Sequence, residues 1–288
     1  MSLHDPAWLD RMYNNRELVP EHPAFFERWA AESAAVREAL GAKVDLRYGE
    51  GPGETLDVIS APQPGAPVLV FIHGGYWRAL DKSEHSFVAR PFHARGACVV
   101  LPNYALCPGT PEAPVGIGDI ALQMVRALEW TWRHVAAHGG DPSRITVAGH
   151  SAGGHLAAMM LGCDWRAVAP DLPADLVRNA LSISGLHDLR PIQHTPFLAP
   201  ALKLTDEDAL RLSPALWPAP RRGTLYTVVG GGESAEFLRQ NELIRDAWGA
   251  ERVPVCEALA GLNHFSVLDT LADPAARLHA LAVELLEA

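Results

Sequence analysis

Two patterns of hydrophobic and polar positions follow one another along this chain. In residues 43–48 (KVDLRY) and 54–60 (ETLDVIS) the two kinds alternate, which predicts an antiparallel pair of strands. From residue 68 onward, short apolar runs replace this alternation, as is typical of strands buried on both faces of a sheet. The later segments predict strands at 68–72, 97–101, 145–149, 179–185, 224–230 and 252–259.

Segments of helical character separate these strands. Residues 22–40 have an amphipathic pattern, with Pro23 in the first turn and Gly41 as the stop signal. Further helices are predicted at 83–93, 117–138, 152–161, 234–248 and 273–287. Because strands and helices alternate, the expected fold class is α/β. Its mostly parallel central sheet should be covered by helices on both faces and joined by right-handed crossovers.

The chain of 288 residues is expected to form a single domain. A helical segment at about 1–41 precedes the sheet, and residues 186–222 interrupt the alternation of strands and helices. That interruption is rich in proline and too long for a simple connection. We expect it to form a short cap over the carboxyl ends of the strands, where ligands bind in sheets of this kind.

The composition argues against several classes of function. A formal net charge of -10 without a basic cluster disfavours nucleic acids and anionic membrane surfaces as partners. No apolar run approaches the roughly 18 residues that span a bilayer, and no signal peptide is visible. The 4 cysteines form no CxxC pair, which indicates reduced thiols and a cytoplasmic location. No metal or other cofactor is expected; the expected partner is a small-molecule substrate, and a homodimer is left open.

Residues 145–161 (ITVAGHSAGGHLAAMML) begin as a buried strand and end as a helix. Between the two, Gly149, Ser151 and Gly153 form a G-x-S-x-G motif, in which a strained turn projects the serine oxygen into a site. A Cβ at either glycine would clash with the neighbouring strand or helix. The structural alternative is a glycine-rich turn that binds a nucleotide, but the segment lacks the P-loop and G-x-G-x-x-G spacings. Ser151 is therefore the candidate nucleophile.

The sequence HGGYW follows the apolar strand 68–72 directly. Acyl transfer needs backbone N–H groups that stabilise a tetrahedral oxyanion, one after the nucleophile and others from a glycine loop after an earlier strand. Gly74, Gly75 and Ala152 are the candidates for this oxyanion hole. The structural alternative is an ordinary glycine turn. His73 is expected to brace the loop and not to act as a base.

A histidine just past the last core strand is the candidate general base. His264 follows strand 252–259, from where it can fold back over the serine. His150 lies beside Ser151 and is expected to point elsewhere. Three other histidines are expected to be structural or to line the pocket, namely His155, His187 and His194.

The third catalytic residue should follow strand 224–230. Glu233 is the first carboxylate beyond that strand, so the chain order is nucleophile, acid and base, as in hydrolases with a Ser-Asp/Glu-His triad. Asp188, which follows strand 179–185, is the competing acid. Glu236, three residues further on, is the other carboxylate there, and it could instead simply face solvent on the next helix.

The residues around these groups give weaker signals. Six candidates for an aromatic pocket are also ordinary core types, namely Tyr76, Trp77, Asn103, Tyr104, Phe197 and Phe265. Three basic residues lie in loops from which they could pair with a substrate carboxylate, namely Arg78, Lys82 and Arg190. Each of these is more often a solvated surface residue.

Taken with these residues, the chain resembles the α/β-hydrolases of the arylformamidase (kynurenine formamidase) type over nearly its whole length. The resemblance rests on HGGYW and on PNYALCP, GHSAGGHL, SGLHDLRP, GGESAEFLRQ and YNNRELVPEHP. It implies a serine hydrolase without a cofactor that converts N-formyl-L-kynurenine and water to L-kynurenine and formate. It also implies the roles given above to Ser151, His264 and the three oxyanion donors. Eukaryotic members have an aspartate where Glu233 stands, which affects the transfer of substrate more than that of the triad.

Three alternatives remain open at this point. A small-molecule carboxylesterase would use the same machinery, and acyl transfer to an acceptor other than water is not excluded by the residues. A catalytically silent binding protein of the same fold is the alternative of another class, although such proteins usually lack one triad member. The sequence leaves open the preference for amides or esters, the acyl group, the residue that binds a substrate carboxylate, the oligomeric state and the pathway.

Overall fold

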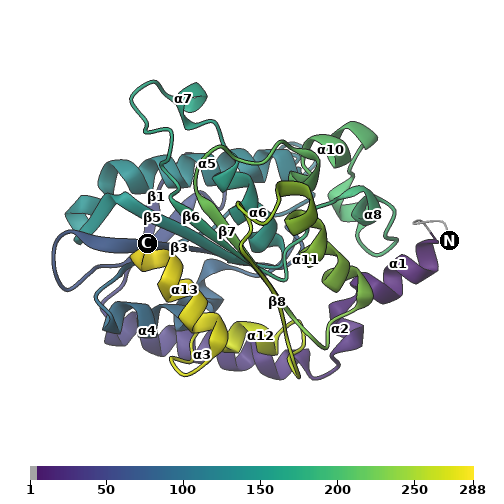
Figure 1. Cartoon of the computed structure of the whole chain (residues 1–288), viewed down its shortest axis with the longest axis horizontal. Helices are drawn as coiled ribbons and strands as arrows, with labels where there is room; N and C mark the ends of the chain where they lie inside the picture. The colour runs from purple at the N-terminus through teal and green to yellow at the C-terminus, as the bar shows by residue number, and fades with distance from the viewer. Residues whose placement is uncertain (1–4) are drawn as a thin grey trace.

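Within residues 5–288, which the computed structural model describes, eight strands form one central sheet (Figure 1). The strand order is β1-β2-β4-β3-β5-β6-β7-β8. β2 runs antiparallel to both of its neighbours, and all other pairs are parallel. The bounds are β1 Lys43–Arg47, β2 Thr55–Ile59, β3 Ala66–Ile72, β4 Cys98–Pro102, β5 Gly140–His150, β6 Asn179–Ile183, β7 Thr224–Gly230 and β8 Val255–Leu259. This sheet confirms the predicted α/β class and the antiparallel pair at its start.

Helices cover both faces of the sheet, and each face has its own hydrophobic cluster (Figure 1). One cluster includes residues of α1 Pro6–Tyr13, α5 Ile117–His134, α6 Ala152–Leu161, α8 Arg190–Gln193 and α11 Ala235–Trp248. The other includes residues of α3 His22–Ala39, α4 Ala89–Ala94, α12 Ser266–Asp269 and α13 Arg277–Glu287. No helix of the described chain has both the length and the apolar character needed to cross a bilayer.

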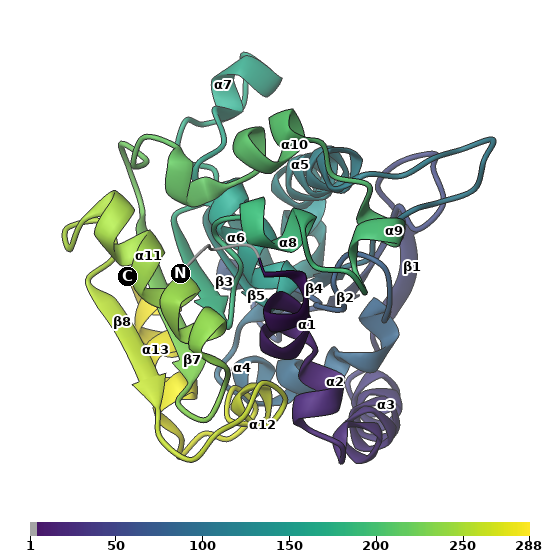
Figure 2. The same ribbon diagram turned by 90° about the vertical axis from the view of Figure 1, so that its right-hand side faces the viewer.

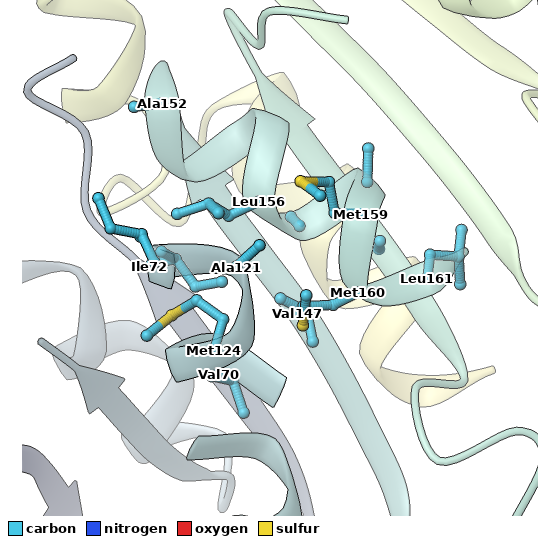
Figure 3. Close-up of a cluster of buried hydrophobic side chains, with 14 of the residues drawn as sticks. Val70, Ile72, Ala121, Met124, Val147, Ala152, Leu156, Met159, Met160 and Leu161 are labelled. Carbon is cyan, nitrogen blue, oxygen red and sulfur yellow. The ribbon is translucent and has the colours of Figure 1, made fainter. Parts of the chain in front are cut away.

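The helix α6 lies at the centre of the first cluster. All of its residues are buried, as expected of a helix that is apolar all round. Figure 3 shows Leu156 and Met160 of α6 in one group with Ile72 of β3, Val147 of β5 and Met124 of α5. Burial of an aliphatic side chain of this size stabilises the fold by roughly 1.5–3 kcal/mol. The packing therefore holds the first turn of α6, and the serine before it, at the end of β5.

Two predicted helices differ from the structure. Residues 83–93 do not form one helix: they contain two 3₁₀ turns, η1 Lys82–Glu84 and η2 Ser86–Val88, before the short α4. Pro91 has no N–H to donate, so regular α-helical bonding through this stretch is interrupted. The last helix begins at Arg277 and not at residue 273, after a turn that contains Pro274.

The N-terminal helices lie beside short helices from the second half of the chain. Figure 2 shows α1 and α2 Asn15–Leu18 passing between α8 and α12. The first four residues of the predicted segment 1–41 lie outside the described residues. Residues 186–222 contain α8 and three further short helical elements, which are α9 Ala199–Leu202, α10 Asp206–Arg211 and η4 Pro214–Leu216. The remaining short elements of the chain are η3 Val135–His138 and α7 Trp165–Val168.

Candidate active site

Ser151 stands on a strained turn between β5 and α6. Its backbone has φ 57° and ψ -118°, a conformation that residues with a Cβ rarely adopt. The Ser151 N–H donates to the carbonyl of Ile183 at 2.8 Å, so β6 supports the turn. The side chain is almost completely buried, yet it lines a cavity. This is the strand-turn-helix context that the motif requires.

The two glycines beside Ser151 are dictated by close approach of the backbone. A Cβ at Gly153 would stand 2.0 Å from the carbonyl oxygen of Ile72 at the end of β3. A Cβ at Gly149 would stand 2.1 Å from the carbonyl oxygen of Gly153. Neither contact is sterically allowed, so the turn can be this tight only with glycine at both positions.

Glu233 and His264 form a buried hydrogen-bonded pair. His264 Nδ1 lies 2.6 Å from Glu233 Oε2, and both side chains are at most 5% exposed. Glu233 Oε1 accepts two further hydrogen bonds, from Ser184 Oγ at 2.5 Å and from the Gly230 N–H at 2.8 Å. The carboxylate is thus fixed by three donors. With Nδ1 engaged, Nε2 is the imidazole nitrogen left to accept a proton.

The other two acidic candidates have different partners. Asp188 is paired with Arg190, with 2.9 Å and 2.8 Å between their side-chain atoms, and it does not contact His264. Glu236 does not face solvent, which corrects the expectation from its helical position. Its side chain is 3% exposed, accepts from Tyr13 Oη at 2.6 Å and is paired with Arg239. This bond ties α1 to α11.

The glycine loop after β3 lies directly against Ser151. A Cβ at Gly74 would be 3.1 Å from the Ser151 Cβ, and Gly75 lines the same cavity as Ser151. Ala152 is the first residue of α6, so its N–H belongs to the helix terminus that lacks intrahelical acceptors. Of the three predicted oxyanion donors, Gly74 and Ala152 therefore lie next to Ser151, and Gly75 lines its cavity.

A stack of two rings braces this loop from behind. The ring of His73 stacks on Tyr104, with centroids 4.2 Å apart and an interplanar angle of 8°. Tyr104 Oη donates to the carbonyl oxygens of His73 and Gly74, at 3.0 Å each. Burial lowers the pKa of His73. His73 accordingly has the bracing position that the sequence predicts.

Ser151 and His264 share a cavity of about 520 Å³. This volume is ordinary for a site that binds a small molecule. Three of the predicted pocket residues line it, namely Tyr76, Phe197 and Phe265. Phe197 comes from the 186–222 insertion, so this segment contributes to the wall of the cavity.

The other three predicted pocket residues do not line the cavity, which is a correction. Trp77 is fully buried and makes an edge contact with the ring of His155 at 5.1 Å. Asn103 contacts Asp81 and His73 through its side chain, at 2.6 Å and 3.0 Å. Tyr104 is occupied by the stack described above. Core packing holds Trp77, and hydrogen bonds at the glycine loop hold Asn103 and Tyr104, so these side chains support the loop.

The N-terminal helices supply the part of the cavity that sequence reasoning missed. Asn15 and Arg16 of α2 line it, as do Phe26 and Trp29 of α3. Asn15 Nδ2 donates to Tyr76 Oη at 3.5 Å, and Tyr76 Oη donates to the Tyr13 carbonyl at 2.6 Å. The amphipathic pattern of residues 22–40 indicated that one face of this helix is buried, but it did not indicate which part of the protein that face contacts.

His150 does not point away from the site, contrary to the expectation. It lines the cavity, its Nε2 lies 2.8 Å from the carbonyl oxygen of His264, and the two rings are 4.7 Å apart. Burial, together with the nearby His264, holds the pKa of His150 well below its usual range. His150 therefore supports the backbone of His264 as a neutral ring. His155 and His187 are buried away from the cavity walls.

The three basic residues that were candidates for binding a substrate carboxylate lie in different surroundings. Lys82 is buried in an ion pair with Asp57 at 2.6 Å. Arg190 is paired with Asp188 at 2.8 Å. Arg78 alone of the three lines the cavity.

Comparison with known proteins places the chain in a family. Residues 69–217 match the family model described as the alpha/beta hydrolase fold. The chain belongs to the α/β-hydrolase fold family. Kynurenine formamidase of Danio rerio is 31% identical to this α/β-hydrolase over 280 residues, which cover 92% of this chain and 88% of the fish protein. The carboxylesterase NlhH of Mycobacterium tuberculosis is 47% identical over a shorter stretch of 96 residues, 33% of this chain and 28% of that protein.

A solved structure supports the same assignment. The crystal structure of a protein from Silicibacter sp. TM1040, provisionally described as a thioesterase, is 32% identical and matches with a TM-score of 0.83. The match covers 97% of this chain and 99% of that chain. The predicted resemblance is therefore confirmed, and the protein is an arylformamidase-like α/β-hydrolase. The formamidase and the carboxylesterase to which it is similar are both hydrolases.

Proposed function

We propose that this α/β-hydrolase is an arylformamidase that cleaves N-formyl-L-kynurenine to L-kynurenine and formate through a Ser-His-Glu triad. The observation that carries the proposal is the buried 2.6 Å contact between His264 and Glu233 at the cavity that Ser151 lines. The choice of a formamide substrate is supported by the similarity to kynurenine formamidases over 92% of the chain.

Acylation would begin with Ser151. Its Oγ attacks the formyl carbon while Nε2 of His264 takes the hydroxyl proton. Glu233 holds the tautomer of His264 that carries a proton on Nδ1, and it stabilises the imidazolium. The oxyanion is stabilised by the N–H groups of Ala152 and of the Gly74–Gly75 loop. His264 then protonates the arylamine nitrogen, the C–N bond breaks, and L-kynurenine leaves.

Deacylation would repeat these steps with water. His264 removes a proton from a water molecule, whose oxygen attacks the formyl carbon of formyl-Ser151. The tetrahedral intermediate collapses, the ester bond to Ser151 breaks, and Ser151 recovers its proton from His264. Formate is released and the protein returns to its starting state. No cofactor enters the proposed cycle. The cytoplasmic location stays a prediction beside it, and a homodimer stays an open possibility.

The test is a substrate panel with Ser151→Ala as the matched variant. The proposal expects wild-type kcat/KM for N-formyl-L-kynurenine to exceed that for p-nitrophenyl acetate and butyrate by more than about tenfold. A formamide is intrinsically less reactive than these esters, so only a site that is fitted to the formamide gives this ranking. Ser151→Ala should lose both activities and should not be labelled by a fluorophosphonate probe.

A carboxylesterase is the second candidate, because 96 residues of this chain are 47% identical to the carboxylesterase NlhH. Efficient cleavage of esters with negligible cleavage of the formamide would replace the first proposal by this one. Absence of a fluorophosphonate adduct on folded wild-type protein would contradict both, and would favour a silent binding protein.

A further inference from the structure

Two arginines from distant parts of the sequence line the cavity. Arg16 belongs to α2, and Arg78 lies six residues after the end of β3. The guanidinium of Arg16 lies over the ring of Phe26, 5.6 Å from its centroid. The guanidinium of Arg78 lies over Phe197, at 5.4 Å, and its Nη1 donates to the Phe197 carbonyl at 3.0 Å. Both aromatic residues line the cavity as well, so each guanidinium is held against the cavity wall.

Neither arginine has an ion-pair partner in the part of the chain that the structure describes. Among residues 5–288, ion pairs account for Lys82 and Arg190, but none involves Arg16 or Arg78. Burial raises the pKa of Glu84, and the positive charge of Arg16 opposes this shift. Glu84 nevertheless forms no ion pair with Arg16 and accepts the Asp81 N–H at 3.0 Å.

The two positive charges act on each other. Burial, followed by the charge of Arg16, lowers the pKa of Arg78. The protein as a whole has a net charge of -10, so the two positive side chains in the cavity are opposite in sign to the charge of the whole protein. A bound anion would remove this repulsion and would accept charge-assisted hydrogen bonds from both side chains.

We infer that Arg16 and Arg78 together bind a carboxylate on the leaving group of the substrate. The inference rests on the proposed function, in which the leaving group L-kynurenine carries an amino-acid carboxylate. It assigns the 15–18 helix a part in substrate selection. The hydrolase would then prefer acyl donors that carry a carboxylate over donors without one that have the same scissile bond, and the N-terminal helices would be its specificity element.

Two matched pairs of substrates separate this inference from the proposed function. The first pair is N-formyl-L-kynurenine and N-formyl-2-aminoacetophenone, which lacks the amino-acid head. The second pair is 3-(2-acetoxyphenyl)propanoate and its propanamide, which test the same carboxylate with an ester bond. Each pair is measured as the ratio of kcat/KM for the member with the carboxylate over the member without it, in wild type, Arg16→Gln, Arg78→Gln and the double variant. Arg11→Gln is the control, since Arg11 is exposed on α1 and does not line the cavity.

We expect the ratio to fall by about 10- to 100-fold in each single variant, mainly through KM, because one charge-assisted contact is lost. Arg16→Lys should recover part of the loss, and high salt should raise KM for the member with the carboxylate only where both arginines are present. A ratio within twofold of wild type in the double variant would overturn the inference. If wild type cleaves neither formamide, the proposed function fails, and the ester pair still decides whether the arginines select a carboxylate.

Discussion

Nδ1 of His264 lies 2.6 Å from Oε2 of Glu233, and this contact joins the loop after β8 to the loop after β7. β7 and β8 are neighbours in the sheet and run parallel, so their carboxyl ends deliver the two residues to the same edge. The glutamate carboxylate is held by Ser184 and the Gly230 N–H on its other oxygen. The acid is therefore fixed in place before any substrate arrives.

Replacing Glu233 tests its proposed role directly. Glu233→Gln keeps the shape of the side chain but removes its negative charge, so the imidazolium loses its counter-charge and the tautomer of His264 is no longer enforced. We expect kcat for the best substrate to fall by about 10²–10⁴-fold with a small change in KM. Steady-state kinetics above and below pH 7 measure this. Glu236→Gln, on the same loop-helix segment, is the comparison, and an equal loss of kcat there would argue against a specific role for Glu233.

Ser184 is expected to be a positioning residue that sequence reasoning did not find. Its Oγ donates to Glu233 at 2.5 Å, and its φ of 50° shows that the backbone is held in a strained conformation there. Ser184→Ala removes one of three donors, so kcat should fall by about 3- to 10-fold while KM stays nearly constant. Ser182→Ala is the matched control, because Ser182 contacts His187 and not Glu233. A loss of stability with unchanged kcat would show that Ser184 is only structural.

The tight turn makes Gly153 sensitive to a single methyl group. Gly153→Ala would place a Cβ 2.0 Å from the Ile72 carbonyl oxygen, so β3 and α6 would have to separate. We expect the free energy of unfolding to drop by more than about 2 kcal/mol and the fluorophosphonate reaction at Ser151 to be lost. Urea denaturation and probe labelling check the two parts. Gly116→Ala serves as control, since a Cβ there meets only Asp119 Oδ2 at 3.6 Å. A Gly153→Ala protein as stable as wild type would contradict the packing argument.

Buried histidines should make the protein less stable in mild acid. Burial lowers the pKa of His155 to about 4 and the pKa values of His85 and His187 to about 3 each. The folded state keeps these rings neutral while the unfolded chain binds protons below about pH 6.5, so stability is fully present above that pH and is lost as pH falls towards 4. Each ring should cost roughly 2 kcal/mol between pH 6.5 and pH 5.

Urea denaturation at several pH values measures this slope. His187→Asn should reduce the slope, because the variant removes one buried group that titrates. His134→Gln is the control at an exposed position. A free energy of unfolding that is the same at pH 7 and pH 5 would contradict the buried, neutral state of these rings.

Much of the candidate site could be predicted because its signals are local. The strand, turn and helix around Ser151 are encoded in one continuous segment, and the steric demand for Gly149 and Gly153 acts over a few residues. Glu233 and His264 follow apolar runs that are readable as strands, and the carboxyl ends of parallel strands meet at one edge. Long-range proximity was thus implied by topology alone.

The aromatic residues show where this reasoning stopped. Tyr76 and Trp77 are neighbours in the chain, yet Tyr76 lines the cavity and Trp77 is buried against His155. Both have positive φ angles, of 50° and 56°, so the alternation of an extended strand does not apply. Composition cannot tell a wall residue from a supporting one when the backbone leaves the regular regions.

The sequence by itself determined the α/β class, the central strands and the motif around Ser151, since these depend on apolar periodicity and local steric limits. Only the tertiary structure decided that α2 and α3 complete the cavity. It alone brought Arg16 to the same cavity as Arg78, although the two residues are 62 positions apart in the sequence (78 minus 16). It also decided that Glu236 is buried against Tyr13. The physical reason is that helices dock through side-chain packing and paired polar groups, whose partners lie far away in sequence and leave no periodic signal.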